Sequence, residues 1–307
     1  MRSSLFGSAV MALLVLDSSG AALADAGPAV ASPDMGAASV SAPSAAGDYL
    51  DTWFARVDAA QASQPHWITP LATTTPRLEE EVRYDQFYQH LGNGASLVNF
   101  DGGKGLELIP TTTSEIILNV PPYEQRSNVK AASGFGDDPF LLIKQRLLSA
   151  NAENGDYIVT AFLSFQAPTG VAAFTNDAWL ITPTLAAGKG FGDFDVQATV
   201  GVALPQSHEN TIGDAISTNV TFQYHIGEFF WPELEVNDTY WSGGLRDGKN
   251  QVILTPGVIL GRFALGGRAK GIIGAGYQFA VSPTLVREPA MTPLFEHAWI
   301  FSARVAF

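Results

Sequence analysis

The chain has 307 residues, of which 46% are hydrophobic and only 15% are charged, well below the roughly 25% of a typical soluble domain. It contains no cysteine, which excludes disulfides, thiolate metal sites, iron–sulfur clusters and cysteine nucleophiles. The net charge of −13 argues against nucleic acid as a partner. This acidity fits either a cation-preferring pore or simply a set of solvated loops.

Residues 1–24 have the pattern of a cleaved signal peptide. Arg2 supplies the positive charge, residues 5–16 form a short apolar core, and Ala22-Leu23-Ala24 offers a small-residue cleavage site before Asp25. The alternative is an N-terminal membrane anchor, but a dozen apolar residues fall short of the roughly 20 that span a bilayer. We therefore expect export.

The next two segments precede any strand. Residues 25–48 are rich in Ala, Pro and Ser, a composition that buries little surface and predicts a disordered tether. Residues 49–64 predict one amphipathic helix, because Leu50, Trp53, Phe54 and Val57 recur at helical spacing before Pro65. This helix suits three positions: inside a barrel, on the inner leaflet, or under the barrel mouth.

Beyond residue 69 the sequence shows strand periodicity, with apolar and polar residues alternating. Three unconnected stretches, 195–204, 216–226 and 270–281, separate an apolar face from a polar one. In 216–226, for example, Val220, Phe222 and Tyr224 oppose Thr221, Gln223 and His225. This pattern predicts strands with one face in lipid, although a soluble β-sandwich would also alternate.

The C-terminus separates these two possibilities. The last strand places Trp299, Phe301, Val305 and Phe307 on one apolar face and ends the chain on phenylalanine. This pattern is similar to the terminal signal by which outer-membrane barrels are recognised for assembly, whereas the ends of soluble domains usually fray. Because an open sheet edge in lipid would leave backbone groups unsatisfied, the sheet over residues 70–307 is expected to close.

The predicted fold is all-β: a transmembrane antiparallel up-and-down barrel of about twelve strands, within a range of ten to fourteen. The first strand is placed at 77–89, and an even total requires 104–120 to form two short strands around Pro110. Trp231, Tyr240, Trp241 and Trp299 are expected in the interfacial aromatic girdles. The predicted outer loops are 121–137, 167–176, 205–213, 242–249 and 282–294, and the predicted inner turns are 151–155, 188–192, 227–230 and 263–269.

The sequence offers little support for catalysis. The five histidines lack metal-ligand spacing, and no Gly-x-Ser-x-Gly nucleophile turn occurs. Residues 188–192, Gly-Lys-Gly-Phe-Gly, predict a tight inner turn, since the helix that a phosphate cradle needs does not follow. We expect no enzyme activity, no metal and no cofactor.

The inward faces carry an unusual set of charged and polar residues that are candidates for lining a lumen. Strand parity, by which alternate residues of a strand face the same side, gives this inward set: Glu79, Glu81, Arg83, Asp85, Lys144, Arg146, Asp195, His225, Glu233, Glu235, Lys270 and Arg304. The alternative is a structural salt-bridge network that fills a closed interior. Parity also predicts that Arg304 faces Glu79 or Glu81 across the closing seam.

Four short strings resemble a known family. They are Lys104-Gly-Leu-Glu-Leu-Ile-Pro110, Asn119-Val-Pro-Pro-Tyr123, Gly136-Asp-Asp-Pro-Phe140 and Pro168-Thr-Gly170. Together they resemble the MetA-pathway of phenol degradation family of bacterial outer-membrane proteins, over roughly residues 67–307. The resemblance implies a porin-like barrel associated with the catabolism of aromatic compounds, and it assigns no ligand-binding residue.

The expected function is passive uptake of small hydrophobic or aromatic compounds across the outer membrane of a Gram-negative bacterium. The alternative is a plugged structural or surface-binding barrel without transport. The expected partners are outer-membrane lipid, the barrel-assembly machinery and a small hydrophobic solute.

Overall fold

The computed structural model describes residues 45–91, 94–100, 105–282 and 295–307. The predicted signal peptide, almost all of the predicted tether and most of the predicted loop 282–294 lie outside the described residues. Helix α1 spans Ala45–Asp51 and helix α2 spans Trp53–Ala62. No helix in the described part is long and apolar enough to cross a membrane.

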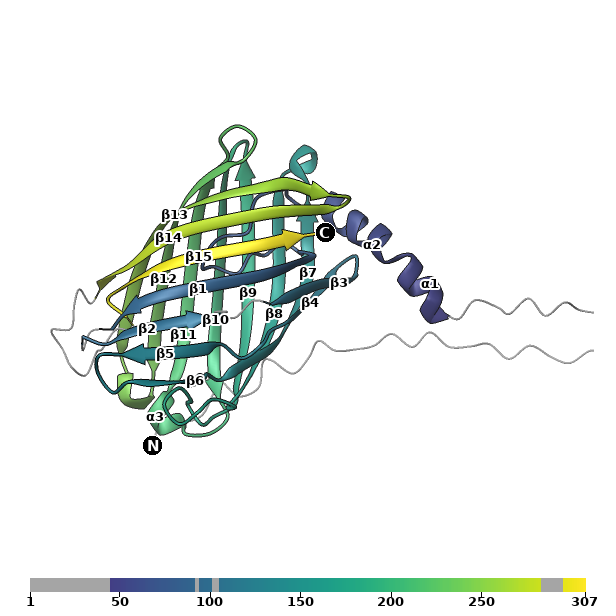
Figure 1. Ribbon diagram of the computed structural model, residues 1–307. Coiled ribbons are helices and arrows are strands. Elements are labelled where there is room, and N and C mark those ends of the chain that lie inside the picture. The colour runs from purple at the N-terminus through teal and green to yellow at the C-terminus, as the bar shows by residue number, and fades with distance from the viewer. Residues whose placement is uncertain (1–44, 92–93, 101–104, 283–294) are drawn as a thin grey trace, which may run out of the picture. The chain divides into compact units, whose positions relative to one another are not determined.

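The rest of the described chain is built almost entirely from antiparallel strands (Figure 1). They are β1 Glu81–His90, β2 Ser96–Phe100, β3 Leu106–Thr111, β4 Ser114–Leu118, β5 Tyr123–Ser127, β6 Ala132–Phe135, β7 Asp138–Ala150, β8 Tyr157–Ala167, β9 Leu180–Phe191, β10 Phe194–Pro205, β11 Asp214–Tyr224, β12 Phe230–Ser242, β13 Lys249–Gly266, β14 Ala269–Ser282 and β15 His297–Ala306. A short helix, α3, spans Glu209–Ile212, and 3₁₀ turns span Ala152–Asn154 and Gly244–Arg246.

The sheet closes because β1 pairs with β15 over ten residues, from Glu81 opposite Ala306 to His90 opposite His297. Three wall positions are each built from two successive pieces: β2 and β3, β4 and β5, and β6 and β7. Counting these as single strands, the described residues form a closed barrel of twelve. The predicted fold class is confirmed, including the turn that divides 104–120 into β3 and β4.

The two mouths of the barrel differ. Short turns at 112–113, 192–193 and 267–268 lie at the mouth where β15 ends, which we call the short-turn mouth. Longer connections, such as 168–179 and 206–213, lie at the opposite, long-loop mouth. The predicted outer loop 121–137 is wrong in part, because most of it forms β5 and β6, which extend the wall beyond β4 and β7.

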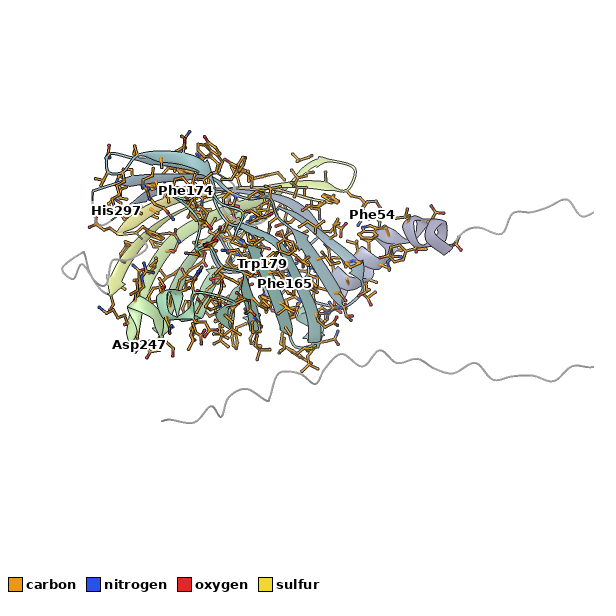
Figure 2. All side chains as sticks on the ribbon, turned by 90° about the horizontal axis from the view of Figure 1, so that it is seen from below. Phe54, Phe165, Phe174, Trp179, Asp247 and His297 are labelled. Carbon is orange, nitrogen blue, oxygen red and sulfur yellow. The ribbon has the colours of Figure 1, made fainter. Side chains whose placement is uncertain are left out.

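The wall has an apolar outside and a polar inside, as the alternation predicts. Ile273, Trp299 and Phe301 point outward and are 53%, 49% and 45% exposed, whereas Gln278, Ser302 and Arg304 on the same two strands are buried. Figure 2 shows side chains on both sides of the strand wall. This arrangement inverts that of a soluble protein and matches a closed sheet in lipid.

Two of the four predicted girdle residues are placed differently. Trp231 and Trp241 are buried inside the barrel, while Tyr240 and Trp299 are exposed on its outside. Trp231 and Trp241 share the strand parity of Glu233 and Glu235, so all four point inward from β12. For Trp231 and Trp241, aromatic character alone therefore predicted the outward face, which is wrong, whereas strand parity indicates the inward face.

Helix α2 packs at the short-turn mouth. Val57 and Ala60 are fully buried against Leu78 and Ile109, and Asp58 forms an ion pair with Arg268 at 2.5 Å. The Arg268 guanidinium lowers the pKa of the Asp58 carboxyl by hydrogen bonding to it. Phe54, labelled in Figure 2, is 46% exposed, and the Arg268 guanidinium of the turn between β13 and β14 lies 4.7 Å from its ring centre.

Candidate functional site

Residues 64–80, between α2 and β1, run inside the barrel as an irregular loop that we call the inserted segment. Its two ends are tied together at the base. The Gln64 side chain donates to the Leu78 carbonyl at 2.8 Å and accepts from the Leu78 N–H at 2.9 Å. Arg77 donates to the carbonyl of Pro65 at 2.6 Å and forms an ion pair with Glu79 at 2.8 Å. Most of these residues are buried.

Barrel carboxylates accept hydrogen bonds from the backbone of the inserted segment. Glu235 accepts the N–H groups of Ala72 and Thr73 at 2.7 and 2.6 Å. The neighbouring inward carboxylate, Glu233, accepts from the Leu71 N–H at 3.1 Å. An irregular backbone buried in a barrel has no partners of its own, so these side chains replace the ladder that a strand would provide.

Barrel cations satisfy the carbonyl groups of the same segment. Arg304 donates to Thr69 and Pro70 at 2.5 and 2.9 Å, and Arg83 donates to Pro70 at 3.2 Å and also to Leu71. Such charge-assisted bonds are stronger than neutral ones, and burial strengthens them further. The segment is therefore bound by anions through its N–H groups and by cations through its carbonyls.

Glycines in the wall make room for two large side chains of the segment. A Cβ at Gly257, Gly274 or Gly276 would lie 2.5 to 2.8 Å from the Leu71 side chain, so Leu71 occupies a niche on β13 and β14 that only glycine provides. Trp67 occupies a second niche over Gly188 and Gly190 and donates to Asp156 at 3.1 Å. The predicted turn 188–192 is thus mostly strand β9, with only Gly192 at positive φ in the turn.

The predicted site residues fall into three groups. Arg83, Lys144, Glu233, Glu235 and Arg304 bond the inserted segment directly, Lys144 through the Arg77 carbonyl at 3.1 Å. Asp85, Arg146, Asp195 and His225 contact other groups: Asp85 pairs with Arg83 at 2.8 Å, Arg146 donates to Ala60 at the end of α2, Asp195 accepts from Gln197, and His225 stacks on Trp231. Glu79, Glu81 and Lys270 line a cavity at the short-turn mouth.

The expected pairing of Arg304 with Glu79 or Glu81 is wrong. The register places Arg304 opposite Arg83, and Glu81 opposite Ala306. The guanidinium of Arg304 donates to carbonyls of the inserted segment and to Ser302. Face parity predicted correctly that Arg304 points inward, but it could not give the register or anticipate the segment that supplies its partners.

Several residues of this network escaped the sequence analysis. Glu115 on β4 pairs with Lys144 at 2.8 Å and accepts the Glu79 N–H at 2.6 Å. Gln197 accepts from Thr75 and donates to the Ile68 carbonyl, and Arg262 donates to His66 and Trp67. Inward parity was the available signal for Glu115 and Gln197, whereas nothing local marks Arg262.

Cavities lie on both sides of the inserted segment. An outer chamber of about 510 Å³ at the long-loop mouth is lined in part by Leu180, Trp241 and Leu245. It shares Ala203 and Ser217 with a middle chamber of about 240 Å³, whose floor includes Ala72 and Thr74 of the segment. A third cavity of about 170 Å³ opens at the short-turn mouth. The segment therefore stands between chambers that face opposite ends of the barrel.

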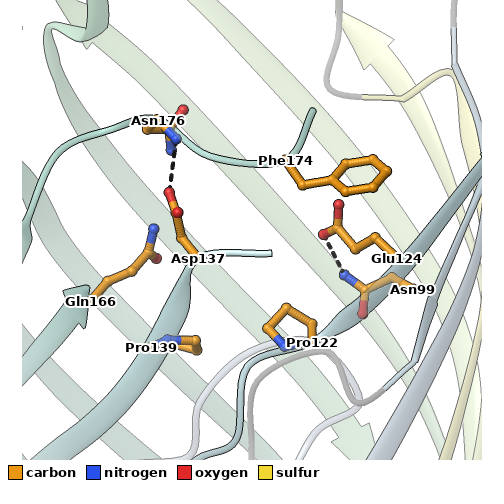
Figure 3. Close-up of a pocket in the computed structure, with 8 residues that line it drawn as sticks. All are labelled: Asn99, Pro122, Glu124, Asp137, Pro139, Gln166, Phe174 and Asn176. Atoms are coloured by element: carbon orange, nitrogen blue, oxygen red, sulfur yellow. Dashed lines mark hydrogen bonds between the residues drawn. The ribbon is translucent and has the colours of Figure 1, made fainter. Parts of the chain in front are cut away.

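A further cavity of about 380 Å³ lies beside the outer chamber, and we call it the loop-side pocket (Figure 3). The connection 168–179 between β8 and β9 folds against it, because the Asp137 carboxylate accepts the N–H groups of Gly170 and Asn176 at 3.2 and 2.8 Å. Its lining residues are Asn99, Pro122, Glu124, Asp137, Pro139, Gln166, Phe174 and Asn176.

Comparisons with known proteins bear on the fold. No protein-family model matches the chain, and no curated protein matches its sequence. Among solved structures, an outer membrane channel from Pseudomonas putida F1 is 12% identical with a TM-score of 0.50, covering 74% of this chain and 94% of that one. A NanC porin is 9% identical with a TM-score of 0.46, covering 73% of this chain and 98% of that one. The first likeness shows the shared barrel fold.

Proposed function

We propose that the protein is a channel in the outer membrane of a Gram-negative bacterium and that small hydrophobic or aromatic compounds cross it by passive diffusion. The observation that carries the proposal is the series of chambers on both sides of the inserted segment. The outer and middle chambers share Ala203 and Ser217 and extend from the long-loop mouth to the inserted segment, as a permeation path requires.

The membrane location is supported by the wall itself. Its outer face exposes large apolar side chains such as Ile273, Trp299 and Phe301, while carboxylates and guanidinium groups are buried inside. In lipid this distribution satisfies both faces, since the closed sheet leaves no unpaired edge. The likeness to an outer membrane channel agrees with this location.

The preference for hydrophobic compounds is supported by the outer chamber. Leu180, Trp241 and Leu245 give it an apolar wall, and Arg246 lies 4.9 Å from the Trp241 ring. Further in, the middle chamber is lined by small hydroxyl side chains that include Thr182, Thr184, Thr199 and Ser217. A phenolic compound has a flat apolar ring and a hydroxyl group. Its ring suits the apolar lining of the outer chamber, and its hydroxyl group suits the hydrogen-bonding lining of the middle chamber. The resemblance to the phenol-degradation family points in the same direction.

Passage requires the inserted segment to move, because it separates the middle chamber from the cavity at the short-turn mouth. The segment is irregular and is held by side chains rather than by a strand ladder. Segments of this kind open locally at lower free-energy cost than core strands. The many buried hydrogen bonds that hold the segment instead favour a second candidate function, that of a permanently plugged barrel without transport.

Liposome swelling with purified protein separates the two candidates. Phenolic solutes are compared with arabinose, using empty liposomes as the baseline. In the Glu235→Gln variant the amide oxygen can accept from only one of the Ala72 and Thr73 N–H groups and the NH2 group faces the other, which weakens the hold on the segment. We expect phenolic flux above baseline for the wild type and several-fold faster flux for this variant. Glu153→Gln, at an exposed residue in a short turn, is the matched control.

If wild type and Glu235→Gln are both folded, as shown by heat-modifiable migration, and both stay at the baseline, the channel is overturned and the plugged barrel stands. If arabinose crosses as fast as the phenolic solutes, the channel stands but its preference for hydrophobic compounds does not.

A further inference from the structure

We propose that the loop-side pocket is a binding site for a small organic cation, with an amine N–H group against Glu124 and a flat apolar body against Phe174 and Pro122. This goes beyond the proposed channel, because the pocket is reached from the long-loop mouth and its occupation does not require the inserted segment to move. Glu124 and Phe174 lie on the same side of the cavity in Figure 3.

The pocket is built where the four family-like strings converge, although they are separated along the chain. The Asn119 side chain accepts from the Gly105 N–H at 2.9 Å and donates to the Pro139 carbonyl at 2.7 Å. Gly136 donates to Pro122 at 2.8 Å. With the Asp137–Gly170 bond, these contacts join all four strings in one hydrogen-bonded unit. Residues that form a pre-organised cavity lose little entropy when a ligand binds.

Close packing fixes the pocket wall. A Cβ on Gly170 would lie 2.8 Å from the Phe174 carbonyl and 2.9 Å from the Asp137 N–H, and a Cβ on Gly136 would lie 3.2 Å from the Pro122 ring. The first position has no space for any side chain. The connection that carries Phe174 is therefore held against the wall at a defined place.

The polar lining of the pocket consists of two carboxylates, Glu124 and Asp137, and three side-chain amides. Both oxygens of Asp137 are already used by backbone N–H groups, so this carboxylate positions the wall. Glu124 accepts one bond from Asn99 at 3.1 Å through Oε1, and within the described residues its Oε2 has no hydrogen-bond partner and its carboxylate forms no ion pair. The Oδ1 atom of Asn99 is buried without a partner in the described part of the chain.

Among the described residues, the neighbouring Arg126 forms no ion pair with Glu124 or Asp137. Arg126 donates to the Lys130 carbonyl at 2.8 Å, and its guanidinium lies 5.3 Å from the Phe174 ring centre. A ligand that brings N–H donors and positive charge would therefore find an acceptor in Glu124 and an aromatic surface in Phe174. About 380 Å³ is within the range of small-molecule sites and accommodates a single substituted ring.

The test compares three molecules of one shape and different charge: benzylamine, benzyl alcohol and benzoate. Their binding to the purified full-length protein in a non-ionic detergent is followed by ligand-observed NMR and by titration calorimetry. We expect saturable binding of benzylamine alone. Glu124→Gln should weaken it at least roughly tenfold, as expected for loss of a charged hydrogen bond. Glu153→Gln, at an exposed residue near the other mouth, should leave it unchanged.

Equal binding of benzyl alcohol and benzylamine would overturn the proposal, and so would benzylamine binding that Glu124→Gln does not weaken. To exclude misfolding, heat-modifiable migration of Glu124→Gln must match that of the wild type. Phe174→Leu provides a second variant that leaves every carboxylate in place, and it should weaken benzylamine binding severalfold. The absence of solute flux would count against the channel only, because this binding is measured without permeation.

Discussion

Arg83 and Arg304 lie directly opposite each other across the seam that closes the barrel, and both donate to the carbonyl oxygen of Pro70. Two like charges at a cross-strand pair normally destabilise a sheet. Here the carbonyls of the inserted segment lie between them, and Asp85 pairs with Arg83 at 2.8 Å. Closure of the wall and seating of the segment are therefore linked at one point.

The first prediction concerns this link. Arg304→Met should lower the free energy of unfolding by about 1–3 kcal/mol, because the Thr69 carbonyl loses its donor and the Pro70 carbonyl keeps only the bond from Arg83. In Arg83→Met/Arg304→Met the loss should exceed the sum of the single losses by at least about 0.5 kcal/mol, since neither arginine can then hold Pro70. Urea unfolding in detergent measures all three. Strictly additive losses would show that the two arginines act independently. Rescue of Arg304→Glu by Glu81→Arg would indicate a direct pairing of residues 81 and 304, which the strand register rules out.

The second prediction tests the niche for Leu71. Gly274→Ala places a Cβ 2.6 Å from the Leu71 side chain, so it should destabilise the folded barrel by about 1–3 kcal/mol and loosen the segment. Adding Leu71→Ala should recover part of that loss. Ala275→Val, on the outward face of the same strand, is the control and should be nearly silent. A double variant no more stable than Gly274→Ala would contradict the niche.

The third prediction concerns orientation. Because the chain has no cysteine, single cysteines can be labelled without background. Leu245→Cys, at a 75% exposed position at the long-loop mouth, should react with a membrane-impermeant maleimide in intact cells. Asp193→Cys, in a short turn at the other mouth, should react only after the outer membrane is permeabilised. The reverse pattern would mean that the barrel is inserted the other way round.

The fourth prediction concerns the chain end. The Phe307 N–H donates to the Glu80 carbonyl at 3.0 Å, and this backbone bond survives removal of the side chain. Phe307→Ala should therefore refold normally in detergent but reach the outer membrane in reduced amount, as expected if the terminal aromatic is an assembly signal. Outer-membrane fractions probed by heat-modifiable migration measure this. If Phe307→Ala lowers the refolding yield in detergent as much as the amount in the outer membrane, the Phe307 side chain stabilises the fold and is not an assembly signal.

The fifth prediction uses the surface pair of Asp58 and Arg268. Since Arg268 lowers the pKa of Asp58 in the folded protein, the pair contributes stability above the ordinary Asp pKa and loses it as the pH falls through the lowered value. Both side chains are substantially exposed, so Asp58→Asn should cost at most about 0.5 kcal/mol at pH 7. Wild type and variant should converge in acid or in high salt.

The sequence by itself determined the barrel, because alternation is local: each residue of a strand takes the opposite face from its neighbour, whatever the partner strand is. Parity alone thus put Glu233, Glu235 and Arg304 inside and Ile273, Trp299 and Phe301 outside. An even strand count then followed from closure, and it divided 104–120 correctly into two strands.

Only the tertiary structure decided what fills the lumen. Residues 64–80 have no regular period, and within the described residues their N–H and carbonyl groups find partners on eight strands: β1, β4, β7, β8, β10, β12, β13 and β15. Such bonds depend on register, and parity does not supply register: it placed Arg304 inward but paired it with the wrong residue. An irregular segment takes its conformation from the groups around it, so its position becomes defined only when the wall has closed.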